Sequence, residues 1–304
     1  MKIAICGGSG LIGSALVDFS KKNNHNIIIV SRKAPDGEAA DPAITYVTWD
    51  ELKDNPEPLE GIEALVNLAG ENLNQRWTRA AKERILQSRL CTVASVASIV
   101  AALKVKPKVV IQASAMGIYG TSDSATFVEN SPTRTDSFLA EVSSKWEQAA
   151  DAIKNTRLVK IRITVVLSNK GGAFPLLRLP YKLGVGGKMG DGHQWTSWIH
   201  IADMVGIINH CIHDAGISGP VNAAAPHPVR NEDFGRTVAK VYHRPHWLKV
   251  PGFAVSAAMG EASKLVLEGQ KVLPAKLLEH GYTFQFPTLE KALEDLHQQE
   301  QEGP

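Results

Sequence analysis

A glycine-rich turn between a short apolar strand and an amphipathic helix is the feature that most restricts how this chain can fold. Residues 2–6 read KIAIC, and residues 11–22 place apolar side chains at helical spacing. Gly7, Gly10 and Gly13 lie between them in a GxxGxxG pattern. Such a turn after the first strand of a βαβ unit is typical of a dinucleotide site. We expect Gly7 to allow the tight turn, Gly10 to let the backbone approach a pyrophosphate, and Gly13 to allow close packing of helix on strand.

Apolar strands and helices alternate through the first half of the chain. Because these strands are continuously apolar, we expect helices to cover both faces of a parallel sheet. The sequence therefore predicts an α/β fold, a Rossmann doubly wound parallel sheet with its ligand site at the carboxyl ends of the strands. Further strands are predicted at residues 27–30, 44–49, 64–69, 109–111 and 158–167, and helices at 79–103 and 138–153.

The alternation changes after about residue 170. We predict an NADP-binding Rossmann domain over residues 1–225, with 171–199 as a substrate-side loop region and 220–225 returning a strand to the main sheet. Residues 226–304 are predicted to form a smaller, mainly helical C-terminal substrate or cap domain. Its helices are expected at residues 231–242, 253–267, 274–279 and 288–296.

Composition excludes several classes of protein. The chain has 33 basic and 31 acidic residues in 304, a net charge of +2, which disfavours a dominant nucleic-acid surface. Its three cysteines are far apart, so we expect no disulfide framework, as in a reducing cytosol. We also expect no metal site, because His210, His213 and Asp214 lie in an otherwise apolar segment with no further ligand evident. The longest uncharged apolar stretch, residues 91–103, is too short for a membrane span, and residues 1–6 are too short for a signal-peptide core. We expect an unprocessed, soluble, cytoplasmic protein without membrane partners; homo-oligomer formation is left open.

The end of the second predicted strand indicates which dinucleotide binds. A carboxylate at this position would accept hydrogen bonds from the ribose hydroxyls of NAD. The sequence instead has Ser31 and Arg32, with no acidic residue until Asp36. An arginine here can pair with the 2′-phosphate of NADP. We therefore predict NADP as the cofactor.

Several segments resemble an extended short-chain dehydrogenase/reductase. These are GGSGLIG at 7–13, NLAGEN at 67–72 and ASAMGIYG at 113–120. Three more are similar to the epimerase-like subfamily with a small extra C-terminal domain, some members of which are labelled cell-division-inhibitor-like: SSKWEQAA at 143–150, GHQWTSWIHI at 192–201 and LEGQKVLP at 267–274. The resemblance covers nearly the whole chain and implies a Rossmann domain, NADP, and a substrate cleft under the C-terminal domain.

The resemblance also implies which residues bind the cofactor. Arg84 is implied as a contact to the cofactor, but exposure to solvent on the face of a helix is an equally good interpretation of this residue. Lys145 is expected as a contact to a ribose or a phosphate. The predicted cofactor-binding residues are Gly7, Ser9, Gly10, Leu11 and Ile12 in the turn; Ser31 and Arg32; Leu68, Ala69 and Gly70 after the fourth strand; and Arg84, Arg89 and Lys145.

The usual catalytic pair of the family, Tyr-x-x-x-Lys, is missing. None of the five tyrosines has a lysine four residues further on. Alignment on Glu147 puts Leu139 in the tyrosine place and Ser143 in the lysine place, and the usual serine or threonine helper falls on Ala115. The nearest substitutes for the missing groups, and our catalytic candidates, are Ser114, Tyr119 and Lys145. For Tyr119, a structural role at a strand end is the alternative interpretation.

Two functions are compatible with this pattern. The first is an NADP-dependent oxidoreductase or epimerase that acts on a small carbonyl or sugar-like substrate. The second is a non-catalytic NADP(H)-sensing regulatory protein, which the missing tyrosine favours. A helical C-terminal domain serves either function, so the sequence does not separate them.

Overall fold

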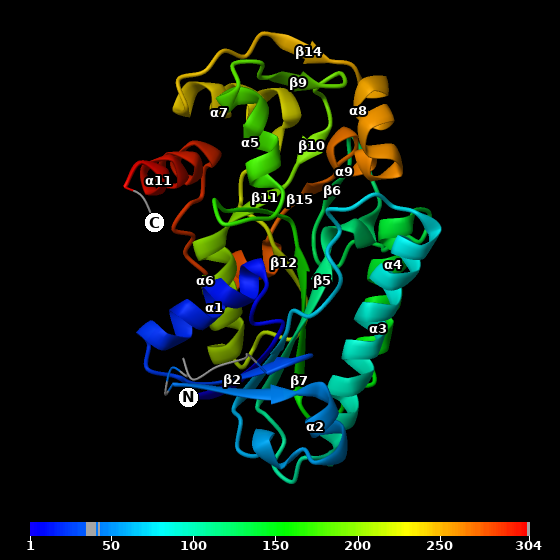
Figure 1. Cartoon of the computed structure of the whole chain (residues 1–304), viewed down its shortest axis with the longest axis vertical. Coiled ribbons are helices and arrows are strands. Elements are labelled where there is room, and N and C mark those ends of the chain that lie inside the picture. Colours follow the sequence, from blue (N-terminus) through cyan, green and yellow to red (C-terminus); the bar gives the residue numbers. More distant parts are fainter. Residues whose placement is uncertain (35–40, 42, 303–304) are drawn as a thin grey trace.

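A seven-stranded parallel sheet lies at the centre of the molecule (Figure 1). The structure is a computed structural model that describes residues 1–34, 41 and 43–302, so Asp36 lies outside the described residues. The strand order, β12-β7-β5-β4-β1-β2-β3, reverses direction between β1 and β4, where a doubly wound sheet binds its ligand. The strands are β1 (Lys2–Cys6), β2 (Asn26–Ser31), β3 (Ile44–Thr48), β4 (Ala64–Asn67), β5 (Val109–Ala115), β7 (Arg157–Ile163) and β12 (Gly219–Ala223).

Helices cover both faces of this sheet, as its continuously apolar strands predict. Ile3 and Ile5 of β1 pack in one cluster with Leu16 of α1 (Leu11–Lys22) and with α6 (Ile201–His213). The intervening Ala4 packs in a second cluster with Val96 of α3 (Arg79–Ala102) on the opposite face. The predicted doubly wound α/β fold is therefore confirmed, and residues 219–223 do return a strand to the main sheet beside β7.

Helix α3 is long and apolar enough to cross a membrane by length and composition. In this structure, however, one face of α3 is buried against the sheet. Its buried residues recur on one face, and Val96, Ile99 and Val100 pack against the sheet. It also lies beside α4 (Phe138–Ala150) in Figure 1. We therefore interpret α3 as a core helix.

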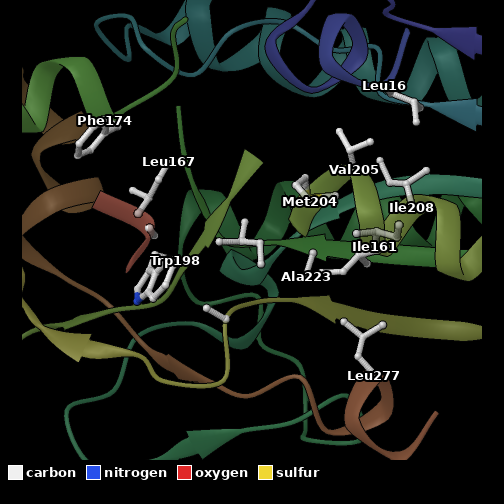
Figure 2. Packing of buried hydrophobic residues seen from close by; sticks show 14 of the residues in the cluster. Leu16, Ile161, Leu167, Phe174, Trp198, Met204, Val205, Ile208, Ala223 and Leu277 are labelled. Carbon is white, nitrogen blue, oxygen red and sulfur yellow. The ribbon is translucent and has the colours of Figure 1, made fainter. Parts of the chain in front are cut away.

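The larger core cluster joins the sheet to the segments that follow it (Figure 2). Trp198, fully buried, and Phe174 pack in one cluster with Leu167, Met204 and Leu277. These side chains come from the segments on both sides of residue 226. The two parts of the chain therefore share one hydrophobic core.

A second layer of short elements lies beyond the carboxyl ends of the main strands, at the top of Figure 1. Three of its two-stranded sheets pair distant segments: β9 (Gly187–Met189) with β14 (Leu248–Val250), β10 (Trp195–Thr196) with β13 (Val229–Arg230), and β6 (Thr126–Phe127) with β15 (Lys271–Val272). Its helices include α5 (Phe174–Lys182), α7 (Asn231–Val241), α8 (Gly252–Met259) and α9 (Lys264–Leu267); α10 (Ala275–Glu279) and α11 (Leu289–Gln301) follow.

Three predicted elements differ in the structure. The strand predicted at 158–167 divides at Thr164 into β7 and β8 (Val165–Leu167), because β8 leaves the main sheet to pair with β11 (Trp198–His200). The helix predicted at 253–267 is broken at Gly260, whose φ is +61°, into α8, the short turn η3 (Gly260–Ser263) and α9. Trp49 begins α2 (Trp49–Asp54) instead of ending β3, because Thr48 forms a capping box with Glu51. A short turn η1 (Glu57–Leu59) follows α2.

Candidate functional site

The glycine turn joins β1 to α1 where the loops after β1 and β4 meet. Gly7 has φ +82°, and a Cβ there would lie 3.0 Å from the Ala69 nitrogen. A Cβ on Gly13 would lie 2.9 Å from the Gly7 carbonyl carbon and would overlap its oxygen. Gly10, the N-cap of α1, donates its N–H to the Gly7 carbonyl at 3.0 Å. The close approach of helix and strand that the sequence predicts therefore depends on Gly13, and the free N–H groups of the first turn of α1 suit an anion.

Ser31 and Arg32 lie at the carboxyl end of β2, next to this turn. The Gly7 N–H donates to the Val30 carbonyl at 3.4 Å, which brings the two loops together. Ser31 Oγ donates to the Lys33 carbonyl at 2.6 Å, and the Arg32 side chain is exposed. This is the place where the adenosine ribose of a dinucleotide lies in the fold, so the guanidinium is available to a 2′-phosphate.

The segment Leu68–Gly70 follows β4 and rests on Arg89 of α3. Arg89 is 8 % exposed, and its Nη1 donates to the Glu71 carbonyl at 3.1 Å. A Cβ on Gly70 would lie 3.3 Å from Arg89 Cζ. Burial lowers the pKa of Arg89 to about 10, which keeps the side chain charged at neutral pH. Arg89 therefore holds the loop from beneath, and a direct contact to the cofactor stays a prediction.

The other two predicted basic contacts are exposed and paired with neighbouring side chains. Arg84 donates from Nη2 to Gln75 Oε1 at 3.1 Å. Lys145 lies on α4, where its Nζ is 2.6 Å from Glu141 Oε1. The structure does not bring Lys145 together with Ser114 and Tyr119. Its contact to the cofactor, like that of Arg84, stays a prediction.

Ser114 and Tyr119 belong to one buried network that Arg162 of β7 connects. The Ser114 hydroxyl donates to Glu147 Oε1 at 2.7 Å, and Arg162 donates to both oxygens of that carboxylate at 2.8 and 3.0 Å. Arg162 Nη1 also donates to the Tyr119 hydroxyl at 2.8 Å, and this hydroxyl donates to Asn222 Oδ1 at 2.7 Å. Burial raises the pKa of Tyr119, although Arg162 opposes this shift. A neutral tyrosine with both hydrogen bonds used is suited to holding strands together.

Tyr119→Phe tests whether this hydroxyl has a structural role. The change leaves Arg162 Nη1 and Asn222 Oδ1 each without one partner in a buried place. We expect the free energy of unfolding in urea to fall by about 1–3 kcal/mol. NADPH affinity, measured by calorimetry, should stay within about twofold of the parent. Unchanged stability with weakened NADPH binding would instead place the hydroxyl at the cofactor.

A cavity of about 190 Å³ opens beyond the carboxyl ends of β5 and β7. Leu139, at the usual tyrosine position, lines it together with Ala115, at the usual position of the helper hydroxyl. Ser143, at the lysine position, is buried, and its Oγ donates to the Leu139 carbonyl at 2.7 Å. The usual tyrosine and helper hydroxyl are thus replaced by apolar side chains at these two positions. A short turn η2 (Met116–Tyr119) follows β5, and its first two residues reach the cavity. The further lining residues include Leu73, Trp77, Met116, Gly117, Gly120, Thr121, Ser137, Phe138, Ile163, Thr164, Val165, Glu261, Lys264, Leu265, Glu268 and Gln270.

Most of these lining residues were missed by sequence reasoning. Leu73 and Trp77 precede α3, Phe138 begins α4, and Leu265 lies in α9. No window of the sequence contains them all. Gln270 could have been found from the sequence, because it lies in the segment LEGQKVLP, which supports the resemblance to the epimerase-like subfamily. Among the residues that the structure describes, no group of three or more His, Cys, Asp or Glu is placed to hold a metal ion.

The parallel sheet, the glycine turn after its first strand and the cavity beside β5 define a protein of the short-chain dehydrogenase/reductase type. The model of the NAD dependent epimerase/dehydratase family matches residues 3–224, and a domain of unknown function, DUF1731, matches residues 250–296. The chain belongs to the NAD dependent epimerase/dehydratase family.

Relatives match over nearly the full chain. The epimerase family protein YfhF of Bacillus subtilis is 43% identical over 299 residues, covering 97% of this chain and 98% of that protein. The crystal structure of the human epimerase family protein SDR39U1 with NADPH has a TM-score of 0.91 and 35% identity, covering 98% of this chain and 99% of that one. A nucleoside-diphosphate sugar epimerase from Corynebacterium glutamicum has a TM-score of 0.77 and 34% identity, covering 99% of this chain and 61% of that one.

Proposed function

We propose that this protein is an NADP(H)-dependent oxidoreductase or epimerase that acts on a small carbonyl compound in the cavity beyond β5. The observation that carries the proposal is the glycine turn: Gly13 allows α1 to approach β1 so closely that a Cβ would overlap the Gly7 carbonyl oxygen. That turn presents the amino end of α1 to a pyrophosphate. The NADPH in the structure of human SDR39U1 supports the same cofactor here.

Each part of the cleft has a role in this proposal. The turn from Gly7 to Ile12 would hold the pyrophosphate, and Ser31 with Arg32 would hold the phosphorylated ribose. Leu68 and Ala69, which lie against Gly7, would line the path from the glycine turn to the cavity. The bound dinucleotide supplies a carbon centre that donates or accepts hydride.

Proton transfer must differ from that of the usual tyrosine enzymes. Leu139 has no proton to give, and Ser143 and Ser114 use their hydroxyls to donate to the Leu139 carbonyl and to Glu147. With these three positions unable to supply the proton, our proposal takes it from solvent or from the substrate itself. Phe138 and Leu139 make the side of the cavity formed by α4 largely apolar.

Arg32→Glu is the variant that tests the cofactor. A charge-assisted contact to the 2′-phosphate contributes about 1.5–3 kcal/mol, so we expect calorimetry to show NADPH affinity at least tenfold lower and NADH affinity little changed. Lys22→Glu is the matched control, because it makes the same charge change at the end of α1 that lies away from the glycine turn. Equal loss in both variants, or none in either, would contradict the prediction.

NADPH oxidation with a small-molecule cell extract then tests turnover. Oxidation that Arg32→Glu abolishes supports the enzyme. NADPH binding without oxidation by any fraction of the extract would favour the regulatory alternative, which the missing Tyr-x-x-x-Lys pair supports. Failure to bind either dinucleotide would overturn both.

A further inference from the structure

The walls of the cavity beyond β5 are largely apolar, although Thr121, Ser137 and Thr164 also line it. Trp77 comes from the loop before α3, Phe138 and Leu139 from the start of α4, and Leu265 from α9, with Met116 after β5. The volume of about 190 Å³ is close to that of an engineered apolar cavity of about 150 Å³ that holds benzene. The cavity is open on one side, and the space between its walls suits a single ring.

The charges around the cavity do not suit a diphosphate. Three ionisable side chains line it: Glu261, Lys264 and Glu268, which is one positive charge against two negative. Arg and Lys are the side chains that bind phosphate through charge, and burying an anion without a compensating positive group is costly. A diphosphate at this place would meet more negative than positive side chains.

Two basic side chains beside the cavity, Lys82 and Arg134, already have acidic partners. Lys82 of α3 lies 2.5 Å from Glu261 Oε2. Arg134, which lies against the cavity residue Gly120, has Nη1 3.7 Å from Asp136 Oδ2. Recruiting either cation for a phosphate would break an existing pair. With these two cations paired, Lys264 is the basic side chain that lines the cavity, against Glu261 and Glu268.

Gln270 supplies a polar group in this apolar site. It is 5 % exposed, and its carboxamide Nε2 donates to the Met116 carbonyl at 2.9 Å. Because a carbonyl can only accept, this bond fixes which end of the amide is nitrogen. Within the described part of the chain no group donates to Oε1. Gln270 lines the cavity, so its carbonyl oxygen is available to a bound molecule.

We infer that the substrate of this cavity is an uncharged, ring-bearing carbonyl compound with one hydrogen-bond donor that Gln270 Oε1 accepts, and not a nucleoside diphosphate sugar. The inference rests on the proposed function, because hydride transfer requires the cofactor to reach the same cavity from the glycine turn. Gln270 acts as a specificity-determining residue that orients the ring.

Calorimetric titrations of the protein with 4-hydroxyacetophenone, acetophenone and UDP-glucose test this inference, each with and without saturating NADP⁺. Oxidised cofactor prevents reduction of the ketones, so the titrations report binding alone. We expect 4-hydroxyacetophenone to bind at least tenfold more tightly than UDP-glucose. Its hydroxyl should improve affinity about three- to tenfold over acetophenone, as one hydrogen bond does.

Three variants locate the binding. Gln270→Met should remove the difference between the two ketones. Leu139→Asp should weaken both at least tenfold, whereas Leu183→Asp, the same change at an exposed position after α5, should leave them unchanged. Leu139→Ile keeps the wall apolar and should retain binding, which guards against a folding defect in the aspartate variant.

The outcomes separate this inference from the proposed function. UDP-glucose that binds as tightly as the ketones, or ketones that fail to bind with and without NADP⁺, would overturn the inference while NADP⁺ binding stands. Ketone binding that Leu139→Asp does not alter would also overturn it, because the site would lie elsewhere. Loss of NADP⁺ binding alone would overturn the proposed function, and the titrations without NADP⁺ would still decide the chemistry of the cavity.

Discussion

A Gly13→Ala protein is expected to be about 3 kcal/mol less stable than the parent and to lose measurable NADPH binding. The added Cβ would lie 2.9 Å from the Gly7 carbonyl carbon and from Gly8 Cα, well inside the 3.5–4.0 Å or so at which carbon atoms attract one another. Gly7 cannot move away, because it already lies against the Ala69 backbone. Overpacking of this kind typically costs about 1–3 kcal/mol, and backbone atoms on both sides put Gly13 at the upper end. Urea unfolding and NADPH calorimetry measure the two effects.

Gly10→Ala is the matched control for this prediction. A Cβ on Gly10 would meet only the Gly7 carbonyl oxygen, at 3.3 Å. We expect its free energy of unfolding to stay within about 1 kcal/mol of the parent, and its NADPH affinity to fall if the pyrophosphate approaches this residue. A Gly13→Ala protein as stable as the Gly10→Ala protein would mean that α1 can shift away from the turn at little cost.

The first half of the fold could be predicted because its signals are local. Strand β1, the glycine turn and α1 lie within residues 2–22, and their predicted bounds match the structure. The wrong prediction of one strand over residues 158–167 has a non-local cause. At Thr164 the chain leaves the main sheet because the Thr164 N–H and hydroxyl both donate to the Ala223 carbonyl, and Val165 donates to Ser197. Nothing between residues 158 and 167 indicates these partners.

The candidate site also has one part that local sequence signals predict and one part that they do not. The dinucleotide side is formed by the loops after β1, β2 and β4, each of which has a motif of its own. The cavity is formed by side chains from five separate segments, and its apolar character depends on the fold, which places Leu139 beside Trp77 and Leu265. Ser114 and Tyr119 were chosen for their hydroxyl groups, but a sequence cannot show that Glu147 and Arg162 engage both.

Arg162→Met is expected to lower the free energy of unfolding by about 3–5 kcal/mol. Arg162 and Glu147 are 4 % and 9 % exposed and share two hydrogen bonds of 2.8 and 3.0 Å. Removing one partner leaves the other charge buried without compensation. In the parent, hydrogen bonds and the charge of Glu147 outweigh burial and raise the pKa of Arg162, so the guanidinium stays charged across the range of pH in which the protein folds. Urea unfolding at neutral pH measures the loss.

The double variant Arg162→Met/Glu147→Leu shows what the pair does beyond stability. Replacing both charges removes the unpaired anion, so we expect it to regain more than half of the loss. Recovery should be incomplete, because Ser114, Tyr119 and the Glu129 carbonyl still lose their partners. A double variant no more stable than Arg162→Met would show that the hydrogen bonds to these groups, and not the ion pair, hold β5, β7 and α4 together. Since Ala115, Ile163 and Leu139 on these three elements line the cavity, the same network fixes the shape of the site in which the substrate is proposed to bind.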